Sequence, residues 1–326
     1  MTATPTAPPP APTQPIHPPL WAFVVVILTG VALSVSSRVG GAFAVAVKNP
    51  FEAALVNFVV GWVMLVIIIA FMPAARKQLG AIPGYVKERT LPWWALLGGF
   101  AGAFYVAMQC TAVPMIGVAI FTVAVVAGQT SSSLLIDRFG IGPAGRQVIS
   151  GARVVGAALT VVAVAIAVSN RFSTASISIA AVLAAIGGGI ALSGQQAFNG
   201  RLGARTKQPI AAALVSFTFG LVGLAILVGI LDVTGHLTWG ALPTGPWWIY
   251  LSGAMGVIYI AVSSWVVPKV GVLIFGLLTV VGQLGGALMF DVVAPLPGSQ
   301  VSVQLIFGLV LTVIAVAIAT RRKKPA

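Results

Sequence analysis

Apolar residues in this chain are gathered in long runs that are separated by short polar or Pro/Gly segments. Runs of about 17 to 25 apolar residues are typical of α-helices that cross a lipid bilayer. Ten runs predict ten transmembrane helices, at about 20–38, 51–72, 92–112, 115–136, 147–168, 177–198, 209–231, 246–266, 270–290 and 302–320. The connections at 112–115 and 266–270 predict tight antiparallel turns, marked by Pro114 and Pro268.

Composition supports the same class of protein. Hydrophobic residues make up 59% of the chain and charged residues 7%, whereas soluble domains carry roughly 25% charged residues. The first 19 residues are rich in proline and contain no Lys or Arg, so they lack the basic start of a signal peptide. We interpret 1–19 as a disordered tail, with a role in peptide docking as an alternative, and 321–326 as a basic tail.

The net charge of +13 invites a nucleic-acid interpretation, but the positions of the basic residues argue against it. When successive helices cross in alternate directions, one side keeps only Arg38, Lys48 and Arg171. The other collects Arg76, Lys77, Lys87, Arg89, Arg138, Arg146, Arg153, Arg201, Arg205, Lys207, Lys269 and the basic residues of 321–324. The positive-inside rule then predicts that both termini are cytoplasmic. We expect a multi-pass protein of the cytoplasmic (inner) membrane, with the lipid bilayer rather than nucleic acid as its partner.

The chain also repeats itself. The Gly-x-Ala-Leu-Ser motif at 30–34 recurs at 189–193, and the segment 92–137, which begins Pro-Trp-Trp, recurs at 246–291. We therefore divide the chain into repeats at 20–168 and 177–320. Each repeat holds five helices, and because five is odd the second copy must enter the membrane from the opposite face. The predicted fold is all-α, with ten transmembrane helices arranged as two inverted five-helix repeats, an architecture typical of transporters.

This pattern resembles the drug/metabolite transporter superfamily. The repeated Gly-x-Ala-Leu-Ser, Pro-x-x-Ala-Ala-Leu-Val-x-Phe-x-x-Gly and Gly-Gln motifs are most similar to its YdcZ-like branch, over residues 20–320. Members of that branch occur as paired five-helix chains or as fused ten-helix chains. The resemblance implies a central cavity lined by the first, third and fourth helix of each half, and it favours export of metabolites or drugs.

Polar side chains inside lipid are costly, so those in mid-helix are candidate functional residues. Gln129 and Gln283 occupy equivalent positions in the fourth and ninth helices, each after a glycine. Their amides could line a path for a neutral or zwitterionic solute. They could equally join helices, because amide side chains and small residues are common at membrane helix interfaces.

Tyr105 and Tyr259 form a second equivalent pair, in the third and eighth helices. They could offer hydroxyls to a cavity or stack on a cationic or planar solute, and the alternative is simple core packing. Gln109 lies one helical turn after Tyr105, on the same face, and its counterpart is Ser263. The two halves differ there, as selectivity would require.

The first and sixth helices end in polar clusters that would lie beside the cavity. Ser34 and Ser193 are equivalent residues within these clusters, and Gln196 and Asn199 follow in the sixth helix. Arg38 could recruit an anion at the outer end of the first helix, or its side chain could extend to the lipid headgroups.

Three acids are candidate coupling or gate residues. Glu52 could titrate during proton coupling, or it could form a local ion pair with Lys48. Asp137 and Asp291 end their helices at opposite membrane faces, where they could bind loops or nearby cations. The first and sixth helices contain no acid, unlike the first helix of the small multidrug branch, which argues against proton exchange for bulky cations through such a residue.

Other motifs are missing. Cys110 is the only cysteine, the two histidines lie in a tail and a loop, and no nucleotide-binding or hydrolase motif occurs. We expect no metal, no cofactor and no enzymatic activity.

The sequence predicts a secondary transporter that moves a small polar organic solute by alternating access around a cavity between the repeats. A passive channel or lipid-headgroup translocase on the same fold is the alternative. The fused halves are compatible with a monomer and with a homodimer.

Overall fold

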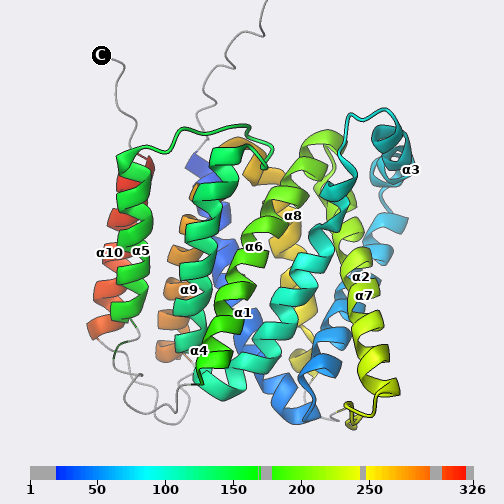
Figure 1. Cartoon of the computed structure of the whole chain (residues 1–326), viewed down its shortest axis with the longest axis horizontal. Coiled ribbons are helices and arrows are strands. Elements are labelled where there is room, and N and C mark those ends of the chain that lie inside the picture. Colours follow the sequence, from blue (N-terminus) through cyan, green and yellow to red (C-terminus); the bar gives the residue numbers. More distant parts are fainter. Residues whose placement is uncertain (1–19, 168, 170–177, 243–246, 294–302, 321–326) are drawn as a thin grey trace, which may run out of the picture.

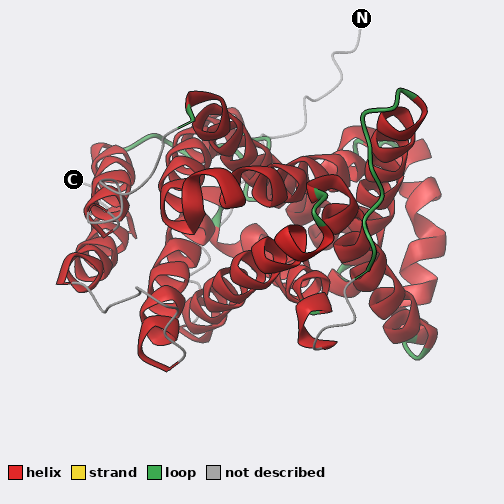
Figure 2. Ribbon diagram, turned by 90° about the horizontal axis from the view of Figure 1, so that it is seen from below, coloured by secondary structure: helices red, strands yellow, loops and turns green. Residues whose placement is uncertain are grey.

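The computed structural model describes residues 20–167, 169, 178–242, 247–293 and 303–320, and this part of the chain is helical and contains no strand (Figures 1 and 2). The predicted tails at 1–19 and 321–326 lie outside the described residues. The helices are α1 Leu20–Val47, α2 Pro50–Ala70, α3 Pro73–Lys87, α4 Gly98–Phe139, α5 Gly151–Ala167, α6 Ile179–Thr206, α7 Pro209–Val233, α8 Ser252–Val270, α9 Val272–Val293 and α10 Val303–Thr320. Short 3-10 turns, η1 Trp93–Leu97 and η3 Trp247–Tyr250, precede α4 and α8.

The lengths of the helices fit a membrane protein. Seven segments of the described chain are long and apolar enough to span a bilayer, and two of them, Trp93–Ile116 and Ile120–Phe139, together cover η1 and most of α4. Shorter apolar helices are Gly151–Ile166, Val272–Gly286 and Ile306–Thr320. An all-helical membrane fold is therefore confirmed, while the number of ten crossings stays a prediction.

Helix α4 doubles back on itself. The Arg201 guanidinium lies 5.2 Å from the ring centroid of Trp94, before α4, and its Nη2 donates to the Gly140 carbonyl, after α4, at 2.6 Å. A straight helix of 42 residues would be about 63 Å long. The two ends can meet at Arg201 only if the chain reverses between them (Figure 1). The reversal expected near Pro114 is present, although helical structure continues through it. In the second half, the break lies at Gly271 (φ 85°), and Pro268 is inside α8.

Two segments differ from the sequence prediction. The first helix was expected to end near residue 38, but α1 continues to Val47 because Phe43 and Val47 are buried and hold the last turns against the protein. Helix α3 was not predicted, since its charged residues and Pro83 interrupt any apolar run. It packs through Ile82 against Leu202 of α6.

The two halves run in opposite directions and interleave. In Figure 1, α1 begins at the upper face, whereas α6 ends there. The ends of α4, α6 and α8 lie at this face together with α3. We call it the basic face, because these segments carry Arg76, Lys77, Arg138, Arg201, Arg205 and Lys269, and we call the other the opposite face. Helix α1 packs on α8 and α9, and its equivalent α6 packs on α4. Two further contacts, α2 with α7 and α5 with α10, join equivalent helices of the two halves.

Glycines allow the closest crossings. A Cβ atom on Gly30 of α1 would lie 2.1 Å from the Thr279 carbonyl oxygen of α9. Its equivalent, Gly189 of α6, would meet the Val125 carbonyl oxygen of α4 at 2.1 Å. Both contacts lie far inside van der Waals distance, so these two crossings require glycine.

Candidate functional site

A buried cavity of about 50 Å³ lies between the two halves. It is enclosed by α1, α2 and the first part of α4 from one half, and by α6, α7 and α8 from the other. The resemblance implied the first, third and fourth helix of each half, whereas this cavity uses the first, second and third. The fourth helices, which are the second part of α4 and α9, contribute no lining residue.

Most of the lining consists of repeat-equivalent pairs, one residue from each half. These pairs are Leu33 and Leu192, Ser36 and Gln195, Phe58 and Phe217, Gly102 and Gly256, Tyr105 and Tyr259, and Val106 and Ile260. Phe58 and Phe217 meet where α2 crosses α7, with ring centroids 5.1 Å apart. The cavity therefore lies close to the axis that relates the repeats.

Gln195 also brings an amide to the lining. Four lining residues have no equivalent in the lining, and the three polar ones among them form its polar side with Ser36. They are Asn57, Gln109, Ser252 and Gly253. Asn57 and Ser252 were missed in the sequence. Both could have been found by comparing the repeats, because Asn57 aligns with Ser216 and Ser252 with Gly98.

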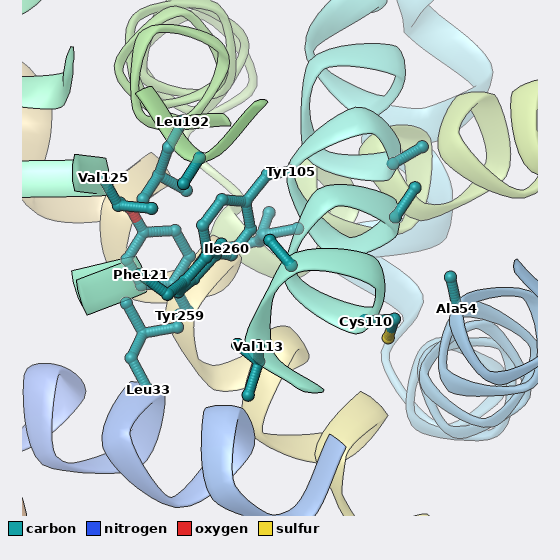
Figure 3. Close-up of a cluster of buried hydrophobic side chains, with 14 of the residues drawn as sticks. Leu33, Ala54, Tyr105, Cys110, Val113, Phe121, Val125, Leu192, Tyr259 and Ile260 are labelled. Carbon is teal, nitrogen blue, oxygen red and sulfur yellow. The ribbon is translucent and has the colours of Figure 1, made fainter. Parts of the chain in front are cut away.

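The predicted tyrosines reach the cavity. Tyr105 and Tyr259 lie among Leu33, Leu192 and Ile260 (Figure 3). The Tyr259 hydroxyl accepts a hydrogen bond from Nε2 of Gln196, and Tyr105 forms a side-chain hydrogen bond with Ser37. Cys110 is fully buried nearby, toward Ala54.

The glutamine pair lies away from the cavity. Gln129 is buried between α4 and α9, where its Nε2 would lie 3.2 Å from a Cβ atom on Gly276, and neither amide atom has a hydrogen-bond partner. Gln283 is partly buried on α9, with its backbone against Gly30 of α1. A role for this pair in transport stays a prediction.

The polar residues of α1 and α6 separate into several places. Ser34 is partly buried and packs on Gly286 of α9. Ser193 is buried, and its hydroxyl lies 2.6 Å from that of Ser132 in α4. Asn199 is buried against Gly98, with its Nδ2 unpaired. Gln196 alone among the four predicted residues touches a lining residue through a hydrogen bond, to Tyr259.

Asp137 ties three elements together at the basic face. Its carboxylate accepts hydrogen bonds from the backbone N–H groups of Val272 and Leu273 at 3.1 and 3.3 Å, at the start of α9. Its Oδ2 also lies 3.2 Å from Nη2 of Arg153 in α5. Asp291 is in α9, and the structure does not describe its side chain.

Glu52 holds a loop at the opposite face. Its Oε2 accepts a hydrogen bond from the backbone N–H of Gly240 at 2.8 Å, and Asn49 donates to the Thr238 carbonyl at 2.9 Å. Glu52 and Lys48 do not form the ion pair considered from the sequence. Arg38 is partly buried on α1 and does not line the cavity.

The cavity suits a small uncharged group. None of its lining residues is charged, and burial of an unpaired ion is costly. A volume of about 50 Å³ accommodates about three or four water molecules. A larger solute would require the two halves to move apart. Within the described residues, no three His, Cys, Asp or Glu side chains gather as a metal site.

Comparison with known proteins places the chain in a family. The model of the family described as "Putative inner membrane exporter, YdcZ" matches residues 21–166 and 180–318. The chain belongs to this YdcZ family of drug/metabolite transporters. Comparison with curated proteins gives no match. A solved structure titled "Crystal structure of protein" shares the fold, with a TM-score of 0.62 and 19% identity over 92% of this chain and 95% of the other.

Membership in the YdcZ family confirms the resemblance seen in the sequence. Each of the two matched regions covers one repeat, so the chain is the fused form of the family. The family match and the apolar helices together identify the chain as a multi-pass inner membrane protein of a transporter family.

Proposed function

We propose that the protein is a secondary transporter that moves a small polar organic solute by alternating access. The observation that carries this proposal is the cavity, which is buried between the halves and lined by equivalent residues of both. In inverted-repeat transporters the substrate site lies at the repeat interface near the middle of the membrane. The two glycine crossings would let the halves rock about this site.

The positions of charge support an orientation. Arg76, Lys77, Arg201, Arg205 and Lys269 lie on the basic face, which we assign to the cytoplasm by the positive-inside rule. Both termini would then be cytoplasmic, and the polar side of the cavity would lie toward the outside. Export is the direction that the family description favours.

Counterflow in proteoliposomes tests the proposal. Vesicles loaded with one unlabelled solute from a panel of amides, amino acids, amines, sugars and nucleosides receive the labelled solute outside. A carrier gives transient, saturable accumulation of label, whereas a channel gives unsaturable flux. Absence of saturable counterflow with every solute would contradict the proposal.

A matched pair of variants ties the flux to the cavity. Leu33→Trp would fill the cavity and should abolish counterflow. Leu28→Trp places the same side chain on the same helix at a position that is 61% exposed, and it should leave counterflow unchanged. Equal activity of both variants would show that the solute passes elsewhere.

A further inference from the structure

The amide of Asn57 lies unpaired at the wall of the cavity. Asn57 is 4% exposed, and neither its Oδ1 nor its Nδ2 has a hydrogen-bond partner. A buried polar group without a partner destabilises a fold, because it has lost its hydrogen bonds to water. Gln129 also has an unpaired buried amide, but Asn57 differs from it because it lines the cavity, where a ligand would lie beside it.

The other hydroxyls of the lining are already paired. The hydroxyls of Ser36 and Ser252 lie 3.0 Å apart and bond each other. Those of Tyr105 and Tyr259 are engaged by Ser37 and Gln196. Of the described side chains with buried polar atoms and no hydrogen-bond partner, Asn57 is the one that lines the cavity; the amides of Gln109 and Gln195 line it as well.

A second amide lies beside it. A Cβ atom on Gly40 would be 3.7 Å from Asn57 Nδ2, 3.4 Å from Gln109 Nε2 and 3.0 Å from Ser252 Oγ. Three polar side chains thus converge at Gly40, where a Cβ atom would crowd them. Four aromatic rings, of Phe58, Tyr105, Phe217 and Tyr259, also line the cavity.

We infer that the solute is a neutral carboxamide or cyclic amide and that Asn57 determines this specificity. An amide presents one N–H donor beside one C=O acceptor, which is the complement of the Asn57 edge, and such bidentate pairing is how Asn reads adenine. The apolar remainder of the solute would pack on the aromatic rings. The inference rests on the proposed transport function and names its substrate class.

Binding of matched ligands tests the inference. Equilibrium dialysis of the purified full chain compares nicotinamide with nicotinate, and acetamide with acetate. The amide of each pair should bind at least about tenfold more tightly than the acid, because a carboxylate offers no donor and would be buried without a counter-charge. Equal affinities for amide and acid would overturn the inference.

Substitutions of Asn57 should have effects that are not expected if Asn57 has only a structural role. Asn57→Leu should weaken amide binding about tenfold to a hundredfold, and it should raise the melting temperature of the ligand-free protein because it removes an unpaired amide. Asn57→Asp should transfer preference from benzamide to benzamidine, whose two donors pair with a carboxylate. Ser216→Ala, at the equivalent position outside the lining, should leave the ratio of amide to acid affinity unchanged.

The outcomes separate the two proposals. If Asn57→Leu keeps wild-type amide affinity or loses stability, Asn57 is structural and the substrate inference fails. If a solute of another class shows saturable counterflow that Asn57→Leu does not alter, the inference again fails while the transport proposal stands. If no solute shows counterflow, the transport proposal fails and takes the inference with it.

Discussion

Single residues at equivalent positions show how the repeat constrains the backbone. Lys48 and Lys207 both have positive φ, 60° and 52°, in the turns between the first two helices of each half. In each turn the lysine is followed by one extended residue and then by a proline that starts the next helix. The proline restricts the residue before it to extended backbone, so the lysine must supply the reversal.

Replacing Lys207 by glycine should therefore stabilise the protein. A left-handed conformation costs a residue with a Cβ about 1–2 kcal/mol, and glycine avoids this cost at some loss of chain entropy. We expect Lys207→Gly to raise the free energy of unfolding by about 0.5–1 kcal/mol in thermal unfolding of the detergent-purified protein. Lys207→Ala removes the same charge but keeps the Cβ atom, so a gain in that variant would disprove the explanation.

Asp137 stabilises the fold through more than its ion pair with Arg153. Because its carboxylate also accepts two backbone N–H groups at the start of α9, Asp137→Ala leaves these donors buried and unpaired. We expect Asp137→Ala to cost about 2–4 kcal/mol of unfolding free energy. Arg153→Gln removes only the cation and leaves both backbone N–H groups paired, so it should cost less than Asp137→Ala. If urea unfolding gives equal losses of unfolding free energy for the two variants, Asp137 stabilises the fold only through its ion pair.

At the scale of helices, close approach decides which helices pair. The crossings at Gly30 and Gly189 bring backbones into contact, and their equivalence makes the α1–α9 and α6–α4 interfaces two copies of one design. Without a hydrophobic driving force between helices in lipid, such backbone contact is a main source of affinity.

An added methyl group should separate these helices. Gly189→Ala places a Cβ atom 2.1 Å from the Val125 carbonyl oxygen and should destabilise the protein by about 1–3 kcal/mol. Gly194→Ala lies in the same helix with no atom within 4 Å, and it should be neutral or stabilising through helix propensity. Comparable melting temperatures for both variants would argue against a close crossing.

For the whole molecule, the interleaving of the halves has a direct test. The main helix contacts, including α1 with α9, α4 with α6, α2 with α7 and α5 with α10, join one half to the other. We expect the chain cut between α5 and α6 to form a stable complex when both halves are co-expressed, and each half alone to be degraded. Co-purification through a tag on one half measures this. A half that is stable alone would show that each repeat forms its own core.

The sequence predicted most of the membrane architecture, because a bilayer permits few alternatives to apolar helices of sufficient length. It missed α3, whose burial depends on Leu202 and other residues distant in the chain. From the sequence we predicted Tyr105, Tyr259 and Gln109 as cavity residues, but not Asn57. The search for equivalent polar pairs favoured Gln129 and Gln283, whereas the cavity's polar side is built where the halves differ.

The unequal sides of the cavity have an evolutionary consequence. In a dimer of two identical five-helix chains, every mutation enters the shared cavity twice, once from each side. Joining both copies in one gene removes that constraint, so Asn57 and its equivalent Ser216 can differ. Specificity for a new substrate can then evolve through substitutions on one side of the cavity, while the residues of the other side stay unchanged.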